Sequence, residues 1–268
     1  MTMTRPRRAI LDGDIIAYRA AFWADAEGIE HLPERIAKDI QNWTPEGCTE
    51  VCIALSCPRE KNYRRMFWPE YKVHRDDTKS PDSMRYALEC IYDAGYATRC
   101  VDHLEADDLM GLLASKGDSI SVTVDKDLRQ VPGWHWNPDK ETDAIEVSLP
   151  DADQFFYQQW MTGDSTDNIW GLWKVGPVKA KKVLATNPVD ELDSIIIAMY
   201  EAESWDLRPE EKIPKDMTKL EFCLAQARSV RILRSGDYNK ETKKISLWCP
   251  NNLLVRNLLD LDKGVVDE

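Results

Sequence analysis

The first 150 residues alternate short apolar segments with stretches of helical periodicity, and this alternation constrains the fold most strongly. The segments 8–13, 51–56, 97–101 and 119–124 are short and apolar, as expected of buried strands. A helix is predicted to begin at Ser80-Pro81, where serine can cap and proline can take the first helical position. Another is predicted over 105–115, with Leu109, Leu112 and Leu113 on its apolar face. Such alternation predicts a three-layer α/β domain with a mostly parallel sheet.

The pattern changes after the fourth apolar segment. Residues 134–148 are predicted to form a hairpin around a polar turn at 138–143, and from Asp151 onward the pattern is mainly helical. We therefore expect an α/β core over 1–160 and a C-terminal helical region over 161–268.

Acidic residues follow three of the four predicted strands. Asp12 and Asp14 close the first strand, Glu105 follows the third and Asp125 follows the fourth. Because the carboxyl ends of parallel strands meet at one edge of a sheet, these carboxylates are expected to converge there. Further acids lie close by in Glu-Ala-Asp-Asp (105–108) and Val-Asp-Lys-Asp (124–127), and Gly-Asp-Ser-Thr-Asp-Asn (163–168) adds a turn entering another helix.

Carboxylate clusters of this kind suit magnesium, which prefers oxygen ligands and is usually held by a few carboxylates. The alternative for any one cluster is structural, because acids complement helix dipoles and make turn hydrogen bonds. Four clusters, three of them at strand ends, favour a metal site, since like charges repel one another unless a cation is present.

The charge distribution decides which partners are plausible. A formal net charge of -12 argues at first against nucleic acid. However, lysine and arginine concentrate at 59–75 and 174–182, away from the acids, which is the segregation expected of a metal site flanked by phosphate-binding strips. Arg64 and Arg65 are interpreted as solvated surface charges.

Cysteine usage and hydropathy indicate a cytoplasmic protein. The 7 cysteines form no C-x-x-C pair, so neither a disulfide framework nor a zinc knuckle is indicated. No secretion signal is recognised, because Asp12 and Asp14 interrupt the first apolar run. No segment has the 18 to 20 or so apolar residues of a membrane helix.

The motifs over Ile10 to Leu184 resemble the 5′-nuclease or flap endonuclease family, which includes bacteriophage 5′→3′ exonucleases and the N-terminal nuclease domain of bacterial DNA polymerase I. The resemblance rests on Leu-Asp-Gly-Asp (11–14), Pro-Glu-Tyr-Lys-Val-His-Arg (69–75), Glu-Ala-Asp-Asp, Asp-Lys-Asp-Leu (125–128) and Thr-Gly-Asp-Ser-Thr-Asp-Asn-Ile (162–169). It implies a PIN-like nuclease core and a metal-dependent 5′→3′ exonuclease or flap endonuclease. The metal-site acids that it implies are Asp12, Glu105, Asp107, Asp108, Asp125, Asp127, Asp164 and Asp167.

The same resemblance implies how DNA is held. Lys72 and Arg75 match the family's basic pair near the scissile phosphate, and Asp12 and Asp125 count with them as catalytic. The segment 169–184 is similar to a helix-hairpin-helix element, in which Gly176 would let backbone N–H groups approach a phosphate while Lys179, Lys181 and Lys182 add attraction. The alternative for Lys72 and Arg75 is an ordinary basic surface patch.

Cofactors, partners and biological setting follow from the resemblance. It implies two Mg²⁺ ions, for which Mn²⁺ can substitute, and a monovalent cation at the hairpin. The expected partner is double-stranded or flapped DNA, with RNA–DNA hybrid as a further substrate, and the expected state is a monomer that binds no membrane. A free-standing phage-type enzyme in the host cytoplasm is expected, acting in DNA replication or degradation and in primer RNA removal.

Two positions depart from the family pattern. Cys57 stands where the family usually has a further aspartate, and a thiol cannot play the same part with magnesium. Lys174 stands where the family has the first glycine of a Gly-x-Gly pair, which puts the geometry of the turn in question.

Two rival functions remain open from the sequence. In a haloacid-dehalogenase-like phosphatase, Asp12 would be the nucleophile and would form a phosphoaspartate. A catalytically dead DNA-binding relative is the other. Among the aromatic residues, Trp160 and Trp205 are expected in the core, whereas Tyr18, Trp170 and Trp173 could either pack in the core or stack on unpaired bases.

Overall fold

The computed structural model describes residues 6–115 and 117–250, which fall into two compact units. Among the described residues, the first unit consists of 6–62, 77–115, 117–152 and 232–236, and the second of 63–76, 153–231 and 237–250. Over the described residues, no helix has the length and apolar character that a membrane span requires.

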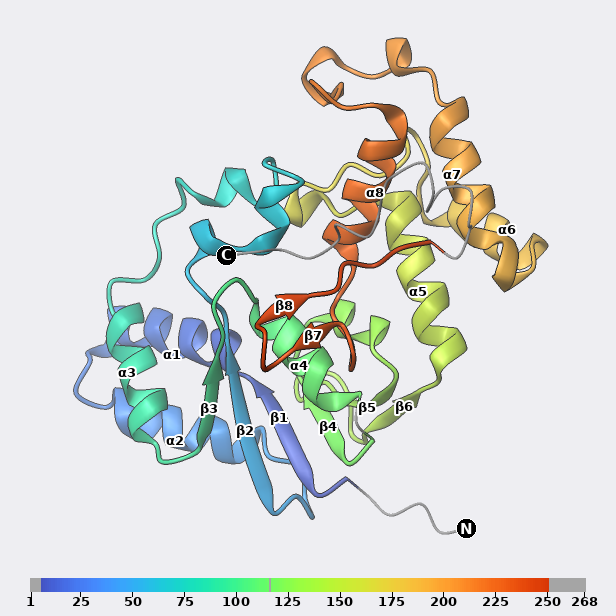
Figure 1. Ribbon diagram of the computed structural model, residues 1–268. Helices are drawn as coiled ribbons and strands as arrows, with labels where there is room; N and C mark the ends of the chain where they lie inside the picture. Colours follow the sequence, from blue (N-terminus) through green and yellow to red (C-terminus); the bar gives the residue numbers. More distant parts are fainter. Residues whose placement is uncertain (1–5, 116, 251–268) are drawn as a thin grey trace, which may run out of the picture. The chain divides into compact units, whose positions relative to one another are not determined.

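A six-stranded sheet forms the centre of the first unit, in the order β3-β2-β1-β4-β5-β6 (Figure 1). The first five strands are parallel to their neighbours, and β6 is antiparallel to β5. The predicted strands and hairpin are therefore confirmed, although the parallel pairing of β5 with β4 was not foreseen. The strands are β1 (Arg8–Asp12), β2 (Glu50–Leu55), β3 (Ala97–Cys100), β4 (Ser119–Val122), β5 (Gly133–Trp136) and β6 (Ile145–Val147).

Helices cover both faces of this sheet. On one face, α1 (Gly13–Glu27), α2 (Leu32–Asn42) and α3 (Met84–Asp93) share a buried core with Leu11, Ile53 and Val122 of the strands. The alternate residues of those strands face α4 (Ala106–Ala114), which packs against β1, β2 and β4 (Figure 1). The predicted three-layer α/β arrangement with a mostly parallel sheet is thus confirmed.

The turn from β1 into α1 fixes where the first acids lie. Gly13 has no room for a side chain, because a Cβ there would lie 2.7 Å from the backbone oxygen of Ala54. Small buried residues on α1, such as Ala17 and Ala21, also allow the helix to approach the sheet closely. As a result, Asp12 ends β1 and also caps α1, where its side chain accepts a hydrogen bond from Ile15 N.

The helix predicted from Ser80-Pro81 begins later than expected, at Met84. The side chain of Asp25, on α1, accepts hydrogen bonds from the backbone N–H groups of Asp82 and Ser83 at 2.7 and 2.8 Å. A carboxylate from another helix therefore satisfies the N–H groups that precede α3, and these residues stay in a turn.

The second unit is mainly helical, as predicted for the chain beyond Asp151, and is built around aromatic side chains. Trp160 is fully buried, donates from Nε1 to Cys223 O and accepts at its carbonyl from Tyr200 Oη. The helices are α5 (Leu149–Thr162), α6 (Pro177–Thr186), α7 (Leu192–Ala202) and α8 (Lys219–Val230), followed by a two-stranded sheet of β7 (Tyr238–Asn239) and β8 (Lys244–Ile245).

The remaining aromatic side chains divide between core and surface. Trp205 is partly buried against Phe222, and Trp170 packs edge-on against Trp68 with ring centroids 4.8 Å apart. The core assignments of Trp160 and Trp205 are confirmed, and Trp170 joins them. By contrast, Tyr18 is half exposed on α1.

Candidate active site

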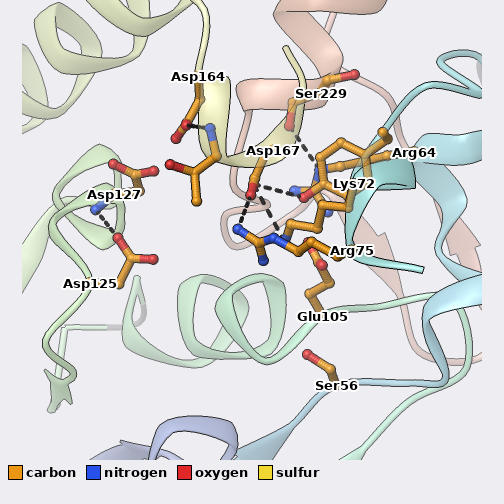
Figure 2. A network of polar contacts seen from close by, with 12 residues as sticks. Ser56, Arg64, Lys72, Arg75, Glu105, Asp125, Asp127, Asp164, Asp167 and Ser229 are labelled. Carbon is orange, nitrogen blue, oxygen red and sulfur yellow. Dashed lines mark hydrogen bonds and ion pairs between the residues drawn. The ribbon is translucent and has the colours of Figure 1, made fainter. Parts of the chain in front are cut away.

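Two of the predicted acids, which lie at the ends of β1 and β4, form hydrogen bonds with the same threonine. Thr123 Oγ1 donates to Asp12 Oδ2 at 2.7 Å and accepts from the backbone N–H of Asp125 at 3.0 Å. The side chain of Asp125 in turn accepts from Asp127 N at 2.8 Å and caps the short 3-10 turn Lys126–Gln130 (Figure 2). One threonine thus links the end of β1 at Asp12 to the end of β4 at Asp125.

Asp12 is buried among like charges. Its side chain is only 3% exposed, and burial, followed by repulsion from Asp14 and Asp125, raises its pKa to about 7. The hydrogen bonds from Thr123 and Ile15 favour the charged form but do not offset this. The protein therefore holds a carboxylate in a position that destabilises its charge, which is typical of functional sites.

Ser56 joins two further acid-bearing segments of the first unit. Its backbone N–H donates to Asp14 Oδ1 at 3.1 Å, while its hydroxyl accepts from Ala106 N at 2.9 Å. The end of β2 is thereby tied both to the start of α1 and to the start of α4. The capping residue of α4 is Glu105, whose side chain is drawn together with that of Ser56 in Figure 2. Glu105 and Asp107 are both partly exposed at this helix start.

Asp108 has a different environment from its neighbours. It is fully buried, and its two oxygens accept from Glu105 N at 3.3 Å and from Leu233 N at 3.2 Å. Its carboxylate thus caps α4 and holds the segment Ile232–Gly236 against that helix.

Cys57, at the position where an aspartate is usual in the family, is buried close to Glu105. Burial and the negative charge of Glu105 raise the pKa of the Cys57 thiol to about 12. The thiol is therefore neutral at physiological pH and is a poor ligand for a hard cation such as Mg²⁺.

Within residues 6–115 and 117–250, no three His, Cys, Asp or Glu side chains form a group that could hold a metal ion. Carboxylates of like charge repel one another, and a bound cation is what would draw them together. The donor set at Asp12 and Asp125 nevertheless fits a divalent cation chemically, because it consists of carboxylate oxygens and carries negative charge that its surroundings do not compensate.

In the second unit, a compact loop presents Asp164 and Asp167. Asp164 pairs with Ile169 through two backbone hydrogen bonds of 2.8 Å, and its side chain accepts from Thr166 N at 2.7 Å. Gly163 and Gly171 cross at the base of the loop, both with positive φ, and a Cβ on Gly171 would lie 2.4 Å from Gly163 N. Only glycine fits at this crossing.

Asp167 is paired with both predicted phosphate-binding cations. Arg75 Nη2 lies 2.9 Å from its Oδ1 and Lys72 Nζ lies 3.4 Å from its Oδ2, while Tyr71 Oη donates to Oδ2 at 3.2 Å (Figure 2). The backbone N–H of Lys72, which has a left-handed φ of 54°, also donates to Asp167 O at 3.0 Å. The structure therefore brings Lys72, Arg75 and Asp167 together within the second unit.

The interpretation of Arg64 and Arg65 as solvated surface charges was wrong. Arg64 is buried and donates to Ser229 O and Arg231 O, near the end of α8, at 2.9 and 2.7 Å. Arg65 makes two hydrogen bonds with the carboxylate of Asp76. Both guanidinium groups hold the segment Tyr63–Asp76 in place.

The basic segment after Asn168 ends in the helix α6, whose lysine side chains are exposed. α6 begins after Gly176 with Pro177 in its first turn, and Lys179, Lys181 and Lys182 are exposed. Lys174 adopts φ 57°, in the left-handed region that favours glycine, and its carbonyl accepts from Lys179 Nζ at 2.9 Å. The turn therefore keeps a glycine-type backbone conformation although a lysine occupies the position.

Some residues of the site gave no recognisable signal in the sequence. Thr123 and Ser56 are common residue types, and their bonds join segments about 110 and 50 positions apart. Gly171 could have been suspected, because glycine often marks a position where the backbone is approached closely.

Comparisons with known proteins place the chain in a family. Residues 7–143 match the family described as "5′-3′ exonuclease, N-terminal resolvase-like domain". The flap endonuclease Xni of Shewanella baltica is 27% identical over 185 residues, which cover 62% of this chain and 68% of that protein.

Among solved structures, a bacteriophage T5 protein co-crystallized with metal ions aligns with a TM-score of 0.59 at 17% identity, covering 83% of this chain and 88% of that one. T5 5′-exonuclease with bound zinc aligns with a TM-score of 0.55 at 16% identity, covering 84% and 89%. These likenesses confirm the predicted 5′-nuclease fold of the core, and the matches give no support to the phosphatase alternative. The chain therefore belongs to the 5′-3′ exonuclease family and is a 5′-nuclease, as its motifs predicted.

Proposed function

We propose that this 5′-nuclease hydrolyses phosphodiester bonds of DNA from 5′ ends, as a 5′→3′ exonuclease or flap endonuclease that requires divalent cations. The observation that supports this most strongly is the buried and uncompensated charge of Asp12 beside Asp125, at the carboxyl edge of a parallel sheet. Such a charge is costly to maintain in a protein that binds no cation.

The proposed ligands of Mg²⁺, for which Mn²⁺ substitutes, are carboxylates. In the first unit they are Asp12, Glu105, Asp107, Asp125 and Asp127, whereas Asp108 is proposed to position α4. Asp164 and Asp167 are added on the strength of the sequence motif. Two bound ions would supply an activated water and would neutralise charge on the scissile phosphate.

The basic residues would hold the substrate. Lys72 and Arg75 donate to oxygens of the scissile phosphate and stabilise the charge that builds up in the transition state. Gly176 and the exposed lysines of α6 bind the phosphate backbone of a duplex without reading sequence, as in a helix-hairpin-helix element with a monovalent cation. In this scheme residues 1–160 are the catalytic core and residues 161–268 the DNA-binding region.

The biological setting is proposed from the family resemblance. It is a monomeric phage enzyme in the host cytoplasm that acts in DNA replication or degradation. Removal of primer RNA from RNA–DNA hybrids is part of the same proposal.

The decisive experiment uses a duplex with a 5′ flap, labelled at either end, with Mg²⁺, Mn²⁺ or a chelator. Metal-dependent release of mononucleotides or short fragments from the 5′ side is expected. Asp125→Asn and Asp127→Asn should abolish cleavage while retaining DNA binding, whereas Asp118→Asn, at an exposed position outside the site, should cut normally. Hydrolysis of a phosphomonoester in place of the flap would overturn the proposal.

A further inference from the structure

A pocket of about 200 Å³ opens beside Asp125 in the first unit, at the carboxyl ends of β4 and β5. It lies between the 3-10 turn Lys126–Gln130 and the turn that joins β5 to β6. Ser121 and His135, which are register partners on the two strands, are both buried and form its floor. Lys126 and Lys140 are exposed and form its mouth.

The floor of the pocket contains a polar atom that needs a partner. Ser121 is fully buried, and within the described residues its hydroxyl makes no hydrogen bond. The Nε2 of the neighbouring His135 already donates a hydrogen bond to Val131 O at 2.7 Å. A buried hydroxyl without a partner is unfavourable, so Ser121 is suited to donate to an acceptor that enters the pocket.

The mouth of the pocket is electropositive. Over residues 6–115 and 117–250, the side-chain ammonium groups of Lys126 and Lys140 form no hydrogen bond or ion pair, so both charges are available to a ligand. The acid Glu141 is already neutralised by Arg129 and also accepts from Asn137 N at 2.8 Å. Asp125 at the rim accepts from Asp127 N and ties the pocket to the proposed metal site.

The closed floor decides which phosphate can enter. An internal phosphodiester continues in both directions and cannot enter a blind pocket, whereas a terminal phosphate can. A phosphate monoester carries up to two negative charges, which match the two lysines, and accepts several hydrogen bonds. We propose that this pocket binds the 5′-terminal phosphate of the nucleic-acid strand, a proposal that rests on the proposed 5′-nuclease function.

Binding without metal tests the pocket separately from catalysis. In chelator, oligonucleotides that differ only in a 5′-phosphate or 5′-hydroxyl are compared by fluorescence anisotropy. The 5′-phosphate should tighten binding by about 10-fold, the effect of one or two charge-assisted contacts. Lys126→Ala with Lys140→Ala should remove this preference, and Lys38→Ala, which removes an exposed lysine from α2, should preserve it. Ser121→Leu, which fills the pocket, should act like the double variant if circular dichroism shows that it folds.

Competition separates the possible sources of the phosphate. Deoxyadenosine 5′-monophosphate should displace the 5′-phosphorylated oligonucleotide from the wild type and not affect the double variant. Displacement by inorganic phosphate at equal concentration would instead assign the pocket to free phosphate and overturn its role with strand ends.

Cleavage of the two substrates in Mg²⁺ completes the test. A higher kcat/KM for the 5′-phosphorylated strand, lost in the double variant, supports the pocket. Equal binding and equal cleavage of both substrates would refute it while leaving the nuclease function intact. Absence of cleavage with either substrate would refute the proposed function, and the binding comparison would still decide the pocket.

Discussion

Thr123 Oγ1 donates a hydrogen bond of 2.7 Å to Asp12 Oδ2 in the interior of the first unit. This bond, together with the one from Ile15 N, is what the fold provides to stabilise a carboxylate whose charge is otherwise disfavoured by burial and by Asp14 and Asp125. The charge of Asp12 therefore affects both the stability of the core and the proposed binding of metal ions.

Asp12→Asn should stabilise the protein while abolishing cleavage. Asparagine caps helices as well as aspartate does and keeps an acceptor, so the main change is loss of a buried charge. Folding raises the pKa of Asp12 from 3.8 to about 7. The free energy of unfolding of the wild type therefore falls as the pH rises above 3.8, and the loss is complete above about pH 7. Urea unfolding should therefore show a gain of about 1–3 kcal/mol at pH 8 that disappears towards pH 4.

Two controls accompany this experiment. Asp118→Asn removes an exposed carboxylate and should leave the free energy of unfolding nearly unchanged at both pH values. Mg²⁺ should raise the Tm of the wild type more than that of Asp12→Asn. A bound ion stabilises the folded protein, and Asp12→Asn removes a proposed ligand of that ion. Equal stability of the two proteins at pH 8 would show that the charge of Asp12 is compensated after all.

Replacing Arg75 or Lys72 by methionine should slow the chemical step. Both cations form ion pairs with Asp167 and would contact the scissile phosphate. Removal of one charge that stabilises the transition state lowers kcat by about 100-fold. Single-turnover rates and DNA affinity are measured separately. Arg85→Met, at an exposed arginine of α3, is the matched control. A loss of affinity with an unchanged rate would make these residues docking contacts only.

Much of the core could be predicted because its signals are local. Each strand is a short apolar segment, and the acids follow the strands directly, so parallel order is enough to bring Asp12 and Asp125 to one edge. The later start of α3 could not be predicted, because the group that holds its preceding turn is Asp25, 57 residues earlier in the chain. Arg64 was misjudged for a similar reason: its acceptors, Ser229 O and Arg231 O, lie 165 and 167 positions away.

The contacts of some candidate site residues depend on distant parts of the chain. Asp108 belongs to the acidic motif, yet its oxygens accept from backbone N–H groups, one of them on Leu233 in a segment that reaches α4 only through the fold. Lys174 gives no sign by its residue type that it adopts a positive φ, because lysine rarely does so, and only its place at a glycine position of the family pointed to an unusual turn. Capping and backbone conformation depend on tertiary neighbours that no local pattern specifies.

Removing charge from α6 should weaken DNA binding without changing the rate of bound complexes. Lys181 and Lys182 are exposed, whereas Lys179 is partly committed to the carbonyl of Lys174. If each contacts one phosphate, Lys181→Ala with Lys182→Ala should reduce the slope of log affinity against log salt by about 2. A double variant at Lys38 and Lys240, both exposed, is the control. An unchanged slope would exclude α6 from the DNA interface.

Gly171→Ala should disturb the loop that presents Asp164 and Asp167. Its φ is 60°, and the new Cβ would lie 2.4 Å from Gly163 N, so the variant suffers both backbone strain and a clash with main-chain atoms that cannot turn aside. Gly47→Ala separates the two effects, because Gly47 has φ 90° but nothing within 4 Å of the added Cβ. We expect Gly171→Ala to lose about 2–4 kcal/mol of stability and most of its cleavage activity. Gly47→Ala should lose about 1 kcal/mol of stability and keep its full cleavage activity. If chemical unfolding gave the two variants equal losses, the crossing of Gly163 and Gly171 would not be what holds the two aspartates in place.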